Sequence, residues 1–321
     1  MSDKPVFLAT HPRACSTAFE RVFMTRRDIL KCAHEPFGDS FYYGPERLSE
    51  RYANDEAARE SSGFSKTTYR DVVNRLEKDG SEGKRVFIKD MAYYLMPPHG
   101  KPATIAPSLR KSEDYTEEGN PTVIPLEILK KFHWTFLIRH PRRGIPSYFR
   151  CCVPPLDEVT GFKEFMPSEA GYVELRRLFD YLREQKIVGP SMAGQSNGQK
   201  QGEIPITVID ADDLLDHPEP VVKAFCEATG IEYKPEMLTW DDDENQKYVS
   251  EAFAKWNGFH NDAIHSKSLT ARTQSHKTIT EETENEEWRQ KYGEEAQKVI
   301  RACVDENVPH YEYLKSFALK F

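Results

Sequence analysis

The stretch FLIRHPRRGIPSY, residues 136–148, joins an apolar strand to a basic turn and to the start of a helix. The apolar run ends at Arg139, and Ser147 follows eight residues later in a helix-like pattern. A turn of this kind can present a guanidinium, a hydroxyl and free helix N–H groups to one phosphate. A solvated arginine-rich turn would have the same composition, so the stretch alone leaves both interpretations open.

A second strand and helix begin almost at the N-terminus. Residues 5–10 are an apolar strand, and an amphipathic helix follows the turn at residues 11–17. In that turn, Arg13 can neutralise a phosphate, while Ser16 and Thr17 can donate hydroxyls near the helix start. The turn lacks the glycines and the Gly-Lys-Ser/Thr ending of a Walker A loop. It therefore predicts an anion site without a dedicated magnesium hydroxyl, with an ordinary capped helix as the alternative.

Composition narrows the class of protein. The 321 residues carry a net charge of −8 and a pI of about 5.8, which argues against general binding to nucleic acid or acidic membranes. We see no secretory leader and no apolar run near the roughly 18 residues of a membrane span, so we expect a cytoplasmic protein. The six cysteines are scattered without CxxC pairs, which favours reduced thiols over a disulfide or metal framework.

Strand and helix patterns alternate along the chain. Strands are expected at residues 5–10, 29–34, 84–89, 134–139 and 205–209, and helices near 16–27, 65–79, 125–132, 143–151, 168–187, 218–229, 248–256 and 284–306. This alternation predicts an α/β fold of three layers, with a mainly parallel sheet and helices on both faces. Ligands bind such sheets at the carboxyl ends of the strands, where Arg13 and Arg139 both fall.

The sequence predicts loops in three polar segments, at residues 97–124, 189–204 and 257–280. Long loops in a compact enzyme are often lids, and we favour that role for the first and third and a tolerated insertion for 189–204. We expect one domain over residues 1–321, with helical C-terminal additions from about residue 235.

Together these segments resemble the sulfotransferase family, which has a P-loop-NTPase-like fold and uses 3′-phosphoadenosine 5′-phosphosulfate (PAPS) as its donor. The family loop that grips the 5′-phosphosulfate is matched by residues 13–17, RACST, which implies donor-binding roles for Arg13, Cys15, Ser16 and Thr17. The family motif that grips the 3′-phosphate is matched by Arg139 and Ser147. Residues 208–218 resemble the family's strand and Asp-Leu segment, so the resemblance covers about residues 5–235.

Details within the resemblance indicate a divergent microbial branch. HEPF at residues 34–37 and IKDMA at residues 88–92 are typical of that branch. The Ser-Gly of the first loop has become Ala14-Cys15, and Cys15 is better explained as a small filler than as a nucleophile. No unambiguous His follows the third strand, and the family's C-terminal Arg-Lys-Gly clamp is missing. Basic residues at 265–277, among them Lys267 and Arg272, are our candidates for that clamp.

The resemblance implies transfer of a sulfuryl group from PAPS to a hydroxyl or amine of a small metabolite, with 3′,5′-adenosine diphosphate as the second product. Arg13 would stabilise the leaving phosphate. Four residues at strand ends are candidates for the remaining catalytic work: His34, Glu35, Lys89 and Asp90. A structural His-Glu pair and an internal Lys-Asp salt bridge are equally compatible with the sequence.

Aromatic residues could line an acceptor pocket, although such pairs are more often packing. The candidates are Tyr42, Tyr43, Tyr93 and Tyr94, with Trp256, Phe259 and His260 covering the site from the C-terminal region.

Two other functions stay open at this point. One is a nucleotide-dependent small-molecule kinase, against which the missing Gly-Lys-Ser/Thr argues. The other is a sulfotransferase-fold protein that has lost sulfuryl transfer, and serves as a nucleotide-binding regulator or reuses the pocket for elimination or cyclisation. We expect a small-molecule partner, no nucleic acid, no membrane and no metal, and we leave a homodimer open.

Overall fold

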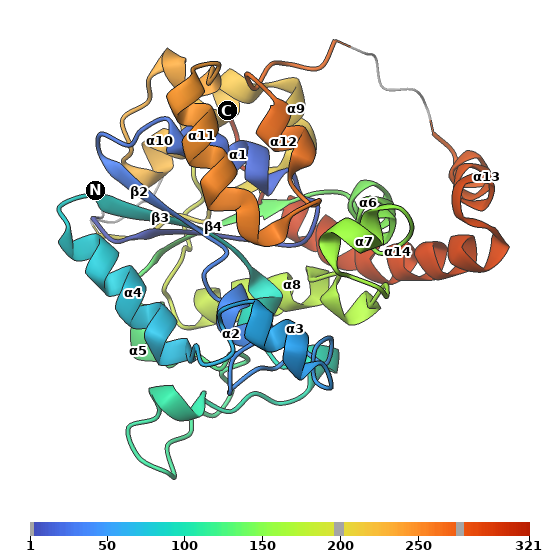
Figure 1. Cartoon of the computed structure of the whole chain (residues 1–321). Helices are drawn as coiled ribbons and strands as arrows, with labels where there is room; N and C mark the ends of the chain where they lie inside the picture. Colours follow the sequence, from blue (N-terminus) through green and yellow to red (C-terminus); the bar gives the residue numbers. More distant parts are fainter. Residues whose placement is uncertain (1–2, 196–201, 274–278) are drawn as a thin grey trace.

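The computed structural model describes residues 3–195, 202–273 and 279–321 (Figure 1). At its centre is a five-stranded sheet in the order β2-β3-β1-β4-β5, and every neighbouring pair of strands is parallel. The strands are β1 (Val6–Thr10), β2 (Leu30–His34), β3 (Arg85–Met91), β4 (His133–Ile138) and β5 (Val208–Asp210). Each overlaps a predicted strand, and the predicted α/β class with a parallel sheet is confirmed.

Helices cover both faces of the sheet (Figure 1). They are α1 (Ser16–Met24), α2 (Gly38–Tyr42), α3 (Glu56–Ser61), α4 (Tyr69–Ser81), α5 (Leu126–Leu129), α6 (Pro141–Cys151), α7 (Leu156–Thr160), α8 (Tyr172–Glu184), α9 (Ala211–Asp216), α10 (Pro218–Thr229), α11 (Asp243–Phe253), α12 (Asn261–His265), α13 (Glu281–Tyr292) and α14 (Glu294–Lys315). Apolar residues of α1, α9 and α10 pack on one face. Those of α4, α5, α8 and α14 pack on the other.

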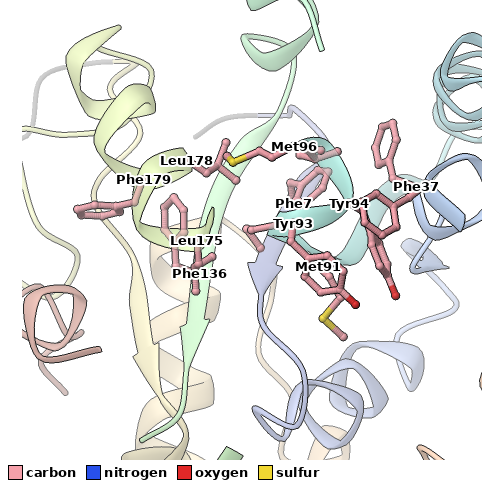
Figure 2. Packing of buried hydrophobic residues seen from close by; sticks show 14 of the residues in the cluster. Phe7, Phe37, Met91, Tyr93, Tyr94, Met96, Phe136, Leu175, Leu178 and Phe179 are labelled. Atoms are coloured by element: carbon pink, nitrogen blue, oxygen red, sulfur yellow. The ribbon is translucent and has the colours of Figure 1, made fainter. Parts of the chain in front are cut away.

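The central strands are buried on both faces, which explains their continuous apolar sequence. In β1, Phe7 points into one core and Leu8 into the other. The ring of Phe7 stacks on Trp134 with 4.3 Å between centroids. Figure 2 shows Phe136 of β4 beside Phe179 of α8, whose ring centroids are 5.1 Å apart. These packed rings fix the strands whose ends carry the candidate site.

Several helices differ from the predicted ones. The single helix expected at 284–306 is two helices, α13 and α14, because Gly293 adopts φ 89° and ψ 169° between them. The helix expected at 248–256 begins earlier, since Asp242 caps α11 by accepting a hydrogen bond from Asn245 N–H. The loop expected at 257–280 contains α12, and its residues 274–278 lie outside the described part of the chain. The short helices α2, α3, α7 and α9 are too brief for periodicity to reveal.

The sheet register brings three strand ends together. Thr10, the last residue of β1, is paired with Met91 of β3 on one side and Leu137 of β4 on the other. The turn after β1 therefore lies between the residues that follow β3 and β4. None of the helices in the described ranges has the length and apolar content needed to cross a membrane.

Candidate functional site

A cavity of about 470 Å³ opens at the carboxyl edge of the sheet, within the size range of small-molecule sites. Its walls come from the turn after β1, the first turn of α1, the ends of β2 and β3, helix α6 and the segment around α12. The lining residues are Pro12, Arg13, Cys15, Ser16, Thr17, Ala18, Glu35, Met91, Tyr93, Tyr94, Arg139, Ser147, Tyr148, Arg150, Phe162, Leu215, Trp256, Phe259, His260, Asp262, Ala263, Ser266, Ser268, Leu269 and Thr270. The cavity thus unites both predicted anion turns.

The first turn reaches α1 through two residues in the left-handed region. Arg13 and Cys15 both have φ 62°, which is unusual for residues that carry a side chain. Cys15 is the N-cap of α1, and no described side chain caps the helix there. The N–H groups of the first turn of α1 are therefore available to an anion in the cavity.

Arg13 connects three separate parts of the chain. Its Nε donates a hydrogen bond of 3.0 Å to Ser147 Oγ in α6. Its Nη1 donates to the carbonyl oxygen of Phe259. The two predicted anion turns are thus in direct contact, and the segment before α12 closes over them.

The backbone of Arg139 is held on both sides by buried rings. His11 Nε2 accepts a 2.9 Å hydrogen bond from Arg139 N–H, and Tyr172 O–H donates one of 3.0 Å to the Arg139 carbonyl. The other ring nitrogen of His11, Nδ1, lies 3.0 Å from the Pro12 carbonyl and donates to it. Burial lowers the pKa of His11 to about 3, so the ring is neutral and can accept from Arg139.

The side chain of Arg139 is only partly satisfied within the protein. Nη1 donates a 2.9 Å hydrogen bond to the carbonyl oxygen of Arg13. Nε is buried and has no hydrogen-bond partner among the described residues. A buried guanidinium N–H without a partner is costly. Arg139 also lines the cavity, as Ser147 does, so its positive charge lies where an anionic oxygen could bind.

A chain of four polar side chains runs from the cavity wall into the core. Thr17 Oγ1 lies 2.8 Å from His260 Nδ1, and His260 Nε2 lies 3.1 Å from His34 Nε2. His34 Nδ1 lies 2.7 Å from Glu20 Oε2. Burial, followed by the charge of Lys89, holds the pKa of both histidines well below the usual value. Burial raises the pKa of Glu20 to about 8.

Glu35 follows β2 with φ 47° and lines the cavity. It accepts hydrogen bonds from Lys89 Nζ and from Tyr94 O–H, the latter at 3.2 Å. Lys89 is fully buried. Asp90 accepts the backbone N–H groups of Phe37 and Met91, each at 2.8 Å.

Three of the four catalytic candidates at strand ends, His34, Lys89 and Asp90, are absent from the cavity lining that the described residues form, and only Glu35 belongs to it. Burial raises the pKa of Asp90 to about 8. Lys89 forms its salt bridge with Glu35. The pairing of Lys89 with Asp90 that the sequence allowed does not occur among the described ion pairs.

Three of these groups could also hold a metal ion. One ligand atom each of His34, Glu35 and His260 lies within 4.8 Å of the others. The nearest contact between His34 and Glu35 is 3.8 Å, from Nε2 to Oε1. The same Glu35 oxygen accepts a hydrogen bond from Lys89.

The predicted basic clamp is not part of the cavity lining. Lys267 is exposed, and both it and Arg272 lie outside the lining that the described residues form. Arg272 instead pairs with Asp212 at 3.1 Å and with Asp216 at 2.7 Å. These acidic residues of α9 hold the guanidinium, so the role of Lys267 and Arg272 in donor binding stays a prediction.

Part of the cavity lining is an aromatic wall. It contains Tyr93 and Tyr94, two of the four tyrosines selected from the sequence, together with Tyr148, Phe162 and Trp256. Figure 2 shows Tyr93 and Tyr94 beside Met91 at the end of β3. Tyr42 packs behind this wall, with its hydroxyl 2.9 Å from that of Tyr93. Trp256 Nε1 is buried without a hydrogen-bond partner among the described residues.

Sequence reasoning missed Glu20, Tyr148 and Arg150. Glu20 lies three residues after Thr17 on the buried face of α1, and a carboxylate on a buried face was the available signal. His260 was selected only as a cover for the site, whereas the structure joins it to His34. Nothing local in the sequence links two histidines that are 226 residues apart.

Comparisons with known proteins bear on this geometry. The chain is 26% identical over 259 residues to the sulfotransferase ppzF of Metarhizium majus, covering 76% of this chain and 73% of that protein. It is 25% identical over 256 residues to the sulfotransferase ppzF of Metarhizium rileyi, with the same coverage. These relatives confirm the predicted resemblance to sulfotransferases. No family model matches the chain.

Among solved structures, the chain is similar to the sulfotransferase domain from the curacin biosynthetic pathway. The TM-score is 0.44 at 13% identity, over 90% of this chain and 98% of that domain. The sulfotransferase domain from the Synechococcus PCC 7002 olefin synthase gives a TM-score of 0.40 at 14% identity, over 84% and 91%.

Proposed function

We propose that the protein is a sulfotransferase that moves a sulfuryl group from PAPS to a hydroxyl or amine of a small metabolite. The observation that carries this proposal is the junction of two anion-binding turns in one cavity, where Arg13 Nε contacts Ser147 Oγ at 3.0 Å. Sequence relatives named sulfotransferases support the class of reaction. The donor and the acceptor class are our inference.

The residues present fit a doubly anionic nucleotide. Arg139 and Ser147 both line the cavity, where they offer a guanidinium and a hydroxyl. These two groups would hold the 3′-phosphate. The first turn of α1, with the Ser16 hydroxyl and the backbone N–H groups of Ser16 and Thr17, would hold the 5′-phosphosulfate. One anion site at the start of α1 and a second at Arg139 and Ser147 suit a nucleotide with phosphates on both its 5′ and 3′ oxygens better than a linear triphosphate.

Arg13 is the residue that we assign to the leaving group. Sulfuryl transfer builds negative charge on the departing phosphate, and a fixed cation there stabilises the transition state more than the ground state. The contacts of Arg13 with Ser147 and with the Phe259 carbonyl hold its guanidinium in place before the donor binds. This preorganisation avoids reorganising the site during the reaction.

The acceptor would lie against the aromatic wall. The rings of Tyr93, Tyr94 and Trp256 suit a flat or apolar body. We therefore propose a small metabolite with an aromatic or apolar part as the acceptor class.

The second candidate is a protein that keeps the fold but not the transfer reaction, and the replacement of the loop Ser-Gly by Ala14-Cys15 favoured it. The structure weakens this argument. Cys15 has φ 62° and ψ 15°, so it adopts the conformation that a glycine would supply. The exchange therefore leaves a left-handed residue at this position, and what it removes is the hydroxyl that Ala14 lacks.

The test is transfer of labelled sulfuryl from PAPS to a pool of small metabolites. We expect one labelled product and an equivalent amount of 3′,5′-adenosine diphosphate. Tight binding of PAPS without any labelled product across hydroxylated and amine acceptors would instead support the second candidate.

A further inference from the structure

The hydrogen-bonded chain Thr17–His260–His34–Glu20 joins the cavity to a buried carboxyl. Its three links measure 2.8, 3.1 and 2.7 Å in that order. Thr17 and Glu20 lie one turn apart in α1, His34 ends β2 and His260 precedes α12. Only Thr17 and His260 line the cavity, while the side chain of Glu20 is fully buried.

Neutral histidines restrict this chain to two arrangements of its protons. A neutral imidazole has one donor and one acceptor nitrogen. When Glu20 is a carboxylate, His34 Nδ1–H donates to Glu20, His260 Nε2–H donates to His34 Nε2, and Thr17 O–H donates to His260 Nδ1. When Glu20 is protonated, every donor and acceptor is reversed. The state of Glu20 therefore sets the direction of the whole chain.

Burial keeps the two histidines neutral, and the charged groups around them add to this effect. Lys89 of β3 and Lys255 disfavour protonation of both rings, and Arg13 does the same for His260. These cations also argue against a metal at His34 and His260. A dication there would face the ammonium of Lys89, and the third ligand would be the Glu35 oxygen that already accepts from it. The two facing Nε2 atoms are explained by a hydrogen bond between the rings.

We propose that Thr17, His260, His34 and Glu20 form a proton relay that removes the proton of the acceptor during sulfuryl transfer. This inference rests on the proposed function. As the acceptor oxygen or nitrogen forms its bond to sulfur, the bond between sulfur and the leaving phosphate oxygen breaks, and the phosphate takes the electron pair. The acceptor proton passes to Thr17 Oγ1. The Thr17 proton passes to His260 Nδ1, the His260 Nε2 proton to His34, and the His34 Nδ1 proton to Glu20.

Glu20 is suited to hold the proton at the end of the relay. Its Oε1 is buried and has no partner among the described residues, so the anion is poorly solvated. Burial raises the pKa of Glu20 to about 8, with Lys89 and Lys255 opposing the rise and Glu35 and Asp90 adding to it. A proton acceptor with a pKa near neutrality is well matched to general-base catalysis.

The kinetic test uses Glu20→Gln, which keeps the size and hydrogen bonding of the side chain but cannot take up a proton. Its single-turnover rate should fall by about 10²- to 10⁴-fold, while the Kd for 3′,5′-adenosine diphosphate stays unchanged. The wild-type rate should rise tenfold per pH unit below about pH 8 and then level off, and the variant should lose this rise. The matched control is Glu174→Gln, another buried carboxyl, on α8 outside the cavity lining of the described residues. An unchanged rate and pH profile in Glu20→Gln would overturn the relay.

A second readout needs neither donor nor acceptor. In protein with ¹⁵N-labelled histidine, the NMR signals of His34 and His260 should change tautomer together with one midpoint near pH 8, and Glu20→Gln should abolish the change. Tautomers that do not respond to Glu20 would refute the relay. So would binding of one equivalent of Zn²⁺ that is lost in His34→Asn, because coordinated nitrogens cannot pass protons. Failure of the proposed function has a different signature, the absence of labelled product in the transfer assay.

Discussion

Replacing Arg139 tests the assignment of the 3′-phosphate site. In the structure, one nitrogen of Arg139 holds the Arg13 carbonyl and another, Nε, is buried without a partner among the described residues. A hydrogen bond from a charged donor contributes about 1.5–3 kcal/mol. Arg139→Ala should therefore weaken 3′,5′-adenosine diphosphate binding by about tenfold to a hundredfold. Isothermal titration calorimetry measures this loss directly.

The ligand and the variant each have a matched control. Adenosine 5′-phosphate lacks the 3′-phosphate, so the same substitution should change its affinity little. Arg142→Ala, in the first turn of α6, removes a partly exposed arginine that is 3.5 Å from Glu284 and lies outside the described cavity lining. It should leave both affinities intact. Equal proportional losses for the two nucleotides in Arg139→Ala would show that the 3′-phosphate is assigned to the wrong turn.

The remaining predictions concern the first turn, Ser147 and acid stability. Arg13→Ala should lower the single-turnover rate by about 10²-fold or more while weakening nucleotide binding far less, and Arg13→Lys should restore part of the rate; unchanged rates would rule out the leaving-group role. Ser147→Ala should weaken the binding of 3′,5′-adenosine diphosphate by about 1 kcal/mol in calorimetry. An unchanged affinity would show that the Ser147 hydroxyl does not contact the 3′-phosphate. The pKa of His11 falls to about 3 in the folded state, so the unfolded chain binds more protons below pH 6.5. Between pH 6.5 and 5 the free energy of unfolding should therefore drop by about 1.6 kcal/mol through His11. His11→Gln should show a smaller drop in urea titrations, and an equal drop would contradict the assignment.

The sheet could be predicted because its strands are buried on both faces. All five residues of β1 are buried, and the resulting apolar run is visible without any partner. The sequence also placed Arg13 and Arg139 at the carboxyl edge of the sheet, and the structure adds that their strands, β1 and β4, are neighbours. The hydrogen bonds of Arg13 with Ser147 and with Arg139 are findings of the structure.

The contact between His34 and His260 could not be predicted in the same way. His34 and His260 meet because α12 folds back over α1, and no periodicity records that path. Basic residues in a loop carry no information about their partners. Arg272 was selected for its charge, and Asp212 and Asp216 of α9 hold it in the structure.

The most direct test of the central claim is a calorimetric comparison of 3′,5′-adenosine diphosphate with ATP, with and without Mg²⁺. The two anion turns at Arg13 and Arg139 suit phosphates at separate ends of a nucleoside, and the first turn lacks the lysine and magnesium hydroxyl of a Walker A loop. We predict that 3′,5′-adenosine diphosphate binds much more tightly than ATP, and that adding Mg²⁺ does not reverse this order of affinities. Equal or stronger binding of ATP would contradict the account.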